Sequence, residues 1–128
     1  MDEPPFILDA ASVVEFAILD LSGPAARFSF VAGGVSLDAR SVSRLVITRG
    51  LLDEAVLLLH CSDRWETVAA EPYSGIEAAE RAAAAAYAGI ALRWKKYRDL
   101  TPAERDEMRT TRSFLRDLVA EGGEGAAP

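Results

Sequence analysis

Residues 55–61 read AVLLLHC, the most apolar strand-length segment of this 128-residue chain. A run this short favours a strand over a helix, which needs ten or more residues. A run without polar alternation is typical of a strand whose two faces are both covered. We therefore place residues 55–61 inside a β-sheet and interpret the flanking segments as its neighbours.

The segments on either side predict an antiparallel meander. Residues 43–49 place Leu45 and Ile47 on one face, and Gly50 ends that run. After the segment, Ser62-Asp63 has the composition of a turn, and alternation resumes over residues 65–69 until Pro72 stops the pairing.

The first forty residues add further strands. Residues 13–21 are nearly continuously apolar and β-branched, which favours a strand, but Ser12 and Glu15 stand at capping-box spacing and leave a helix open. Residues 28–37 alternate around Gly33-Gly34, a dipeptide that supplies the positive φ of a tight turn. This pattern predicts a hairpin.

The second half of the chain predicts two helices and one more strand. Ser74 and Glu77 have capping-box spacing, so we expect an alanine-rich helix from residue 74 to Gly89. Residues 90–94 alternate like a half-buried strand. Thr101 and Glu104 form a second box around Pro102. One face of the helix that follows consists of Met108, Thr111, Leu115 and Leu118, and Phe114 and Val119 widen this face.

Together these elements predict one α+β domain over residues 5–120. It has a mostly antiparallel sheet of five or six strands, one alanine-rich helix packed on the sheet, and a C-terminal helix. Residues 121–128 are rich in glycine and predict a disordered tail.

The charge pattern points to a basic partner. The chain carries 14 Lys and Arg against 20 Asp and Glu, a net charge of −6. Only residues 81–98 are purely basic, with five bases and no acid. An acidic body repels nucleic acid and anionic membranes and attracts basic proteins. The chain has one cysteine and no leader pattern, and its longest uncharged stretch, residues 82–92, is too short for a bilayer. We therefore expect a cytoplasmic protein without a membrane span.

The side chains that carry chemistry are few and scattered. His60 and Cys61 are adjacent, so a strand points them to opposite faces and no Cys–His pair forms. No His or Cys pair has metal-ligand spacing, and Gly33-Gly34 lacks the context of a phosphate loop. We therefore expect no cofactor, no metal site and no enzymatic activity.

The basic segment 93–98, RWKKYR, has two interpretations. Bases interleaved with aromatics are typical of a strip that stacks nucleic-acid bases and contacts phosphates. The alternation, however, turns Trp94 inward and leaves only Tyr97 free to stack. We expect a solvated strand end here, with contact to a protein or a nucleic acid as alternatives.

Three segments resemble a known pattern: AVLLLHCSDRWETV at residues 55–68, SGIEAA at 74–79, and the stretch from Tyr87 to Trp94. They are similar to small bacterial immunity proteins of polymorphic toxin systems. The resemblance implies a cytoplasmic, non-enzymatic inhibitor that covers the active site of a toxin through an acidic surface.

The candidate partner-binding residues follow from these considerations. The acidic ones are Asp53, Glu54, Asp63, Glu66 and Glu71, and Trp65 is either a core residue or an apolar anchor. The alternative function is an assembly or adaptor subunit, or a homodimer, that docks through the sheet edge or the helix over residues 102–119. If the body cannot bury both Phe114 and Leu115, a partner must cover one of them.

Overall fold

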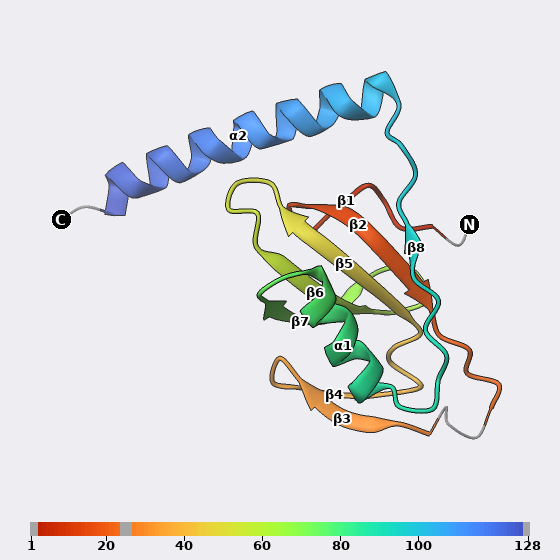
Figure 1. The fold of residues 1–128 in the computed structure, drawn as a ribbon. Coiled ribbons are helices and arrows are strands. Elements are labelled where there is room, and N and C mark those ends of the chain that lie inside the picture. Colours follow the sequence, from red (N-terminus) through yellow and green to blue (C-terminus); the bar gives the residue numbers. More distant parts are fainter. Residues whose placement is uncertain (1–2, 24–26, 127–128) are drawn as a thin grey trace.

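The computed structural model describes residues 3–23 and 27–126. An antiparallel sheet runs in the order β1-β2-β5-β6-β7, and β8 also pairs with β2 (Figure 1). The strands are β1 (Ile7–Leu8), β2 (Ala11–Ile18), β5 (Arg44–Gly50), β6 (Val56–Cys61), β7 (Thr67–Tyr73) and β8 (Lys95–Lys96). The predicted α+β fold is confirmed, β6 is paired on both sides, and most of the ambiguous segment after residue 12 is strand.

Strand β5 shows how the sheet divides the core in two. Leu45 and Ile47 point to one face, where they pack with α1 (Ile76–Ala86) and with the hairpin of β3 (Ser29–Ala32) and β4 (Val35–Asp38). Val46 points to the other face, the inside of the curled sheet, where it packs with Phe16 and Leu59. Alternation along the strand produces both clusters.

The β3–β4 hairpin forms where the sequence predicts it, but as a two-stranded sheet of its own. Gly33 (φ +55°) and Gly34 (φ +79°) make the turn. A Cβ on Gly33 would lie 2.7 Å from the Ala70 carbonyl oxygen, so the turn sits directly against β7. The absence of a side chain at Gly33 permits this contact.

Helix α1 lies close to the sheet because its inner face is alanine: Ala79 and Ala83 are fully buried. The N-cap is Gly75, and no side chain caps the helix. The predicted capping box of Ser74 and Glu77 is therefore wrong. The helix begins one residue later than the pattern requires, which puts Glu77 at the second helical position instead of the third.

Three further local predictions differ from the structure. Pro72 does not end β7, which continues to Tyr73; β7 is an edge strand, where the missing proline N–H is tolerated. Residues 90–94 are not a strand, and only Lys95 and Lys96 pair with β2. Trp65 lies in the turn before β7, not in the strand.

Helix α2 (Pro102–Ala126) starts at the predicted capping box. The Glu104 amide donates to Thr101 Oγ1 at 3.1 Å, and the Thr101 amide donates to Glu104 Oε1 at 2.9 Å. The helix passes over one end of the sheet, and its last turns extend beyond it (Figure 1). Residues 121–126, predicted as a tail, continue the helix; each glycine there costs only about 1 kcal/mol relative to alanine.

Candidate functional site

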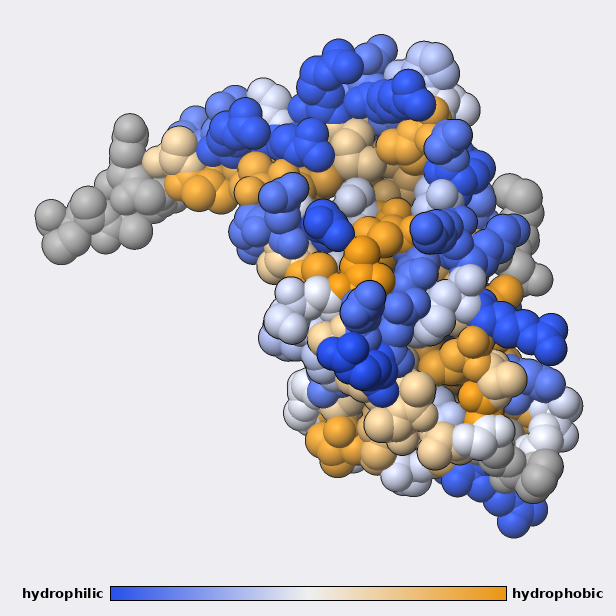
Figure 2. All heavy atoms as spheres, viewed as in Figure 1, coloured by the Kyte–Doolittle hydropathy of each residue, from blue (hydrophilic) through white to orange (hydrophobic). Residues whose placement is uncertain are grey.

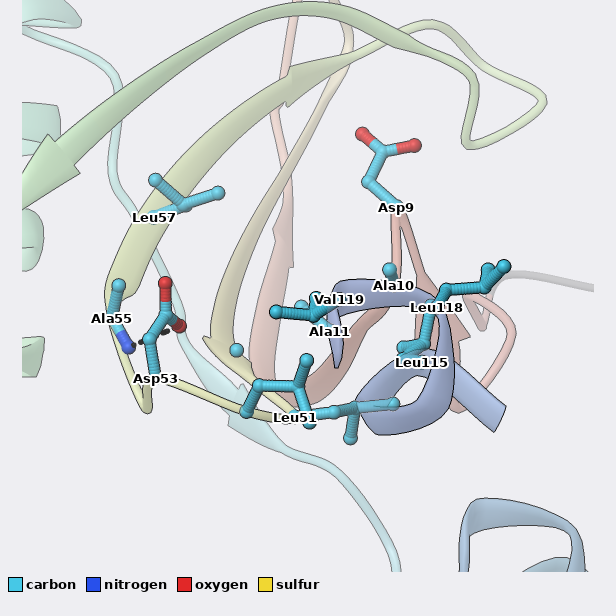
Figure 3. A pocket seen from close by; sticks show the side chains of 12 residues that line it. Asp9, Ala10, Ala11, Leu51, Asp53, Ala55, Leu57, Leu115, Leu118 and Val119 are labelled. Carbon is cyan, nitrogen blue, oxygen red and sulfur yellow. Dashed lines mark hydrogen bonds between the residues drawn. The ribbon is translucent and has the colours of Figure 1, made fainter. Parts of the chain in front are cut away.

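The C-terminal half of α2 and two turns of the sheet enclose an apolar groove of about 490 Å³ (Figure 3). This α2 groove is lined by Asp9, Ala10 and Ala11 at the β1–β2 turn, by Gly50, Leu51, Leu52, Asp53, Ala55 and Leu57 around the β5–β6 turn, and by Leu115, Leu118 and Val119 of α2. Its volume lies in the range of known ligand and peptide sites.

The first half of α2 is anchored to the body, which fixes the groove. Glu104 accepts two hydrogen bonds from Arg98, at 2.7 and 2.9 Å, and these bonds together with the cap lower the pKa of Glu104 to about 2. Met108 is buried, and Arg112 Nε donates to the Leu51 carbonyl oxygen at 3.0 Å. From residue 113 to residue 121, only Leu115 is still half-buried, and the other side chains of α2 are exposed.

The apolar side of α2 is left open above the groove. Leu118 is 47% exposed and Val119 63%; Phe114, at 60%, lies beside them and lines a separate hollow on α2. Figure 2 shows hydrophobic residues along the side of α2 that turns toward the body. Leu52, in the β5–β6 turn, adds a fourth large apolar side chain at 41% exposure. Soluble monomers rarely leave such a contiguous patch open without a use for it.

The body side of the α2 groove is acidic. Asp9 and Asp53 line it, Glu54 lies between Asp53 and Ala55 in the same turn, and no lining residue is basic. We call Asp9, Asp53 and Glu54 the acidic rim. Asp53 Oδ1 accepts a hydrogen bond from the Ala55 amide at 3.0 Å, which holds its carboxylate in place. Asp9 and Glu54 both have positive φ, at 53° and 56°.

The structure separates the six residues that the sequence predicts as partner-binding. Asp53 lines the groove, and Glu54 follows it in the same turn. Asp63 and Glu66 are exposed in the turn at the opposite end of β6, about 17 Å of strand away. Glu71 lies along β7 and contacts His60.

Trp65 is 7% exposed, as the core interpretation predicts. Its ring meets the edge of Phe16 at 5.5 Å, and the Arg44 guanidinium lies 5.5 Å from it. Its φ of 62° is unusual for a bulky residue, and the buried contacts hold it there. Trp65 is therefore not a surface anchor in this structure.

His60 belongs to a buried hydrogen-bond network. Its Nδ1 lies 2.6 Å from the Tyr87 hydroxyl and its Nε2 3.2 Å from Glu71 Oε1, an arrangement that fits a neutral imidazole donating to the carboxylate. Burial lowers the pKa of His60. His60 and Tyr87 are 0% and 1% exposed, so no solute reaches either of these two side chains. Cys61 faces the other cluster, as predicted, and burial raises its pKa to about 12.

A second buried acid lies between the sheet and α1. Glu15 of β2 is 5% exposed and hydrogen-bonds to Glu80 of α1. Burial, and then the neighbouring Glu80, raise the pKa of Glu15 to about 7, while Lys96 lowers it. Within residues 3–23 and 27–126, no group of three or more His, Cys, Asp or Glu is placed to hold a metal ion.

The basic segment 93–98 offers no free aromatic platform. Trp94 packs against the α1-side core, and Tyr97 packs inside the curled sheet with its hydroxyl donating to the Pro4 carbonyl oxygen at 2.8 Å. The expectation that Tyr97 is free to stack is therefore wrong.

Comparison with protein-family models, with curated proteins and with solved structures gave no match. In the part of the chain that the structure describes, no helix has the length and apolarity needed to cross a bilayer.

The sequence identified part of the α2 groove. The breadth of the apolar helix face points to Phe114 and Leu115, of which Leu115 lines the groove, and the acidic turn points to Asp53 and Glu54, of which Asp53 lines it. Asp9 and Leu51 were missed, since their place beside α2 depends on where the helix crosses the sheet. The Arg98–Glu104 ion pair that sets this crossing has no sequence signature beyond opposite charge.

Proposed function

We propose that this protein is a non-enzymatic protein-binding module whose partner docks on the open apolar side of α2 and in the α2 groove. The observation that carries the proposal is the exposure of Leu118 and Val119, which line an apolar groove, with the exposed Phe114 one helical turn before Leu118. Burying them in a complex removes their surface from water, at about 25 cal/mol per Å² of apolar area.

The remaining features agree with binding rather than chemistry. His60 and Cys61, the two side chains that the sequence offered for catalysis, are both 0% exposed and lie in separate clusters. The more specific form of the proposal is the immunity-type inhibitor that the sequence resemblance implies. In that form the partner is a toxin, and Asp53 and Glu54 are the acids that meet its basic active site.

The test compares two variants of α2 that add the same charge. Leu118→Glu places a carboxylate in the apolar side, whereas Ala120→Glu places it two residues on, about 200° around the helix, at an exposed position. The protein is co-expressed with the toxin-like product of a neighbouring gene, and the complex is measured by size-exclusion chromatography. We expect Leu118→Glu to abolish the complex and Ala120→Glu to preserve it.

A complex that survives both variants equally overturns α2 as the docking surface. Failure of the wild-type protein to bind the neighbouring product overturns the immunity-type form. Sedimentation of the wild-type protein alone separates a distinct partner from a second copy: a dimer that Leu118→Glu dissociates would make this chain its own partner and contradict the proposal.

A further inference from the structure

The walls of the α2 groove restrict the backbone conformation of a peptide that can bind there. An extended peptide binds by adding a strand to an open sheet edge. The groove offers no such edge, because its three strand residues are already paired on both sides: Gly50 pairs with Ala11 and its amide donates to the Ala55 carbonyl oxygen. Ala11 pairs with Leu8 and Gly50, and Leu57 pairs with Thr48 and Pro72. The other walls are two turns and a helix.

The wall formed by α2 is itself suited to a helix. Leu115 and Val119 form a row of side chains four residues apart, and Leu118 lies beside this row, three residues from Leu115. Rows of this spacing are the ridges between which the side chains of another helix pack. A helix binds such a surface with apolar residues at three- and four-residue intervals.

The charges around the groove restrict the flank of that helix. The acidic rim of Asp9, Asp53 and Glu54 is unopposed among the lining residues. The nearest bases of α2 are Arg112, whose Nε donates to the Leu51 carbonyl oxygen, and Arg116, which is exposed and does not line the groove. A partner with Lys or Arg beside its apolar stripe complements the rim.

Resting on the proposed function, we infer that the partner presents a basic amphipathic helix, with its apolar residues in the α2 groove and its Lys or Arg side chains against Asp9, Asp53 and Glu54.

The test uses two synthetic peptides of about 18 residues, or five turns. Both carry Leu at three- and four-residue intervals; one has Lys on the flanks and the other has Glu. Binding to the full chain is measured by fluorescence anisotropy at low and high salt. We expect the Lys peptide to bind, to weaken with salt, and to bind at least about tenfold more tightly than the Glu peptide. Equal binding of the two peptides, or binding of neither, overturns the inference.

Two matched double variants locate the charge effect. Asp53→Asn/Glu54→Gln neutralises two acids of the rim, and the Asn Oδ1 can still accept from the Ala55 amide. Asp63→Asn/Glu66→Gln removes the same charge at the opposite end of β6. We expect only the first to weaken binding of the Lys peptide, by about tenfold. Equal loss in both variants means that net charge, not the rim, attracts the peptide, and overturns the inference.

These outcomes are separable from those of the proposed function. If Leu118→Glu abolishes binding of the natural partner while the Lys and Glu peptides bind the chain alike, α2 remains the docking surface and only the basic helix is rejected. If the natural partner binds the Leu118→Glu variant as tightly as the wild-type protein, α2 is not the docking surface.

Discussion

At the scale of single residues, the interior of this protein holds ionisable groups that are connected to each other rather than to solvent. His60 is satisfied by Tyr87 and Glu71, which come from α1's C-terminal end and from β7. Glu15 instead faces another carboxyl group, Glu80, and one of its oxygens is buried without a hydrogen-bond partner. Burial lowers the pKa of His60 and raises that of Glu15, so the stability from His60 falls as the pH drops and the stability from Glu15 falls as the pH rises.

Glu15 gives the residue-scale prediction. Its pKa is about 7 in the folded protein against 4.5 as the ordinary value, so the folded state holds the proton more tightly. The stability that Glu15 contributes is therefore fully present below pH 4.5 and is lost as the pH rises through 7, by up to about 3 kcal/mol. Glu15→Gln, which stays neutral, should remove this fall. Urea unfolding at several pH values between these limits measures it.

The control is Glu107→Gln, an exposed acid of α2, which should keep the wild-type dependence. A Glu15→Gln protein whose stability still declines over the same pH interval would show that the pair does not carry the effect.

Among the helices and strands, two contacts depend on backbones that lie unusually close together. Helix α1 reaches the sheet through Ala79 and Ala83, and the β3–β4 hairpin reaches β7 through Gly33. Both contacts exist because a side chain is small or absent, so both are sensitive to added volume.

The hairpin gives the element-scale prediction, because Gly33 and Gly34 form a matched pair. Both have positive φ, so alanine strains the backbone at either position by about 1 kcal/mol. Only at Gly33 does the new Cβ meet the Ala70 carbonyl oxygen; at Gly34 nothing lies within 4 Å. Gly33→Ala should be the less stable variant by about 1 kcal/mol or more, measured by urea unfolding. Equal loss at both sites would argue that the hairpin does not rest on β7.

Much of the element map could be predicted from the sequence, for physical reasons that differ between residues. The apolar run at 55–61 and the Gly-Gly turn are local signals, and both elements formed where expected. The box of Thr101 and Glu104 held because Pro102 fixes the first helical position. The box of Ser74 and Glu77 did not, because Gly75 takes the cap. For residues 90–94, inward packing of Ile90, Leu92 and Trp94 produced the alternation without strand pairing.

At the scale of the whole molecule, the candidate site depends on how α2 is set against the sheet. The local signals predicted the helix and its broad apolar face, but not the groove. The groove exists because Arg98 forms two hydrogen bonds with Glu104 and Arg112 donates one to the Leu51 carbonyl oxygen. These long-range contacts join residues that no periodicity or spacing connects.

Glu104 gives the whole-molecule prediction. Glu104→Gln loses the charge that Arg98 holds, so α2 should be anchored more loosely. We expect faster amide hydrogen exchange in the first turns of α2 and weaker binding at the α2 groove, with exchange in β5 and β6 unchanged. Asp106→Asn, which breaks only the exposed pair with Arg109, is the control. Unchanged exchange in α2 would mean that Met108 and Arg112 anchor the helix without Glu104.

The length of α2 beyond its last anchor has a mechanical consequence. From Arg112 to Ala126 the helix runs about 21 Å as a cantilever with its root on the sheet. A tilt of about 10° at the root displaces the tip by roughly 4 Å, by simple lever geometry on that helical rise. The helix thus converts a small tilt at Arg112 into a larger displacement of its C-terminal end. A fluorescent probe at that end would report this displacement when a partner binds.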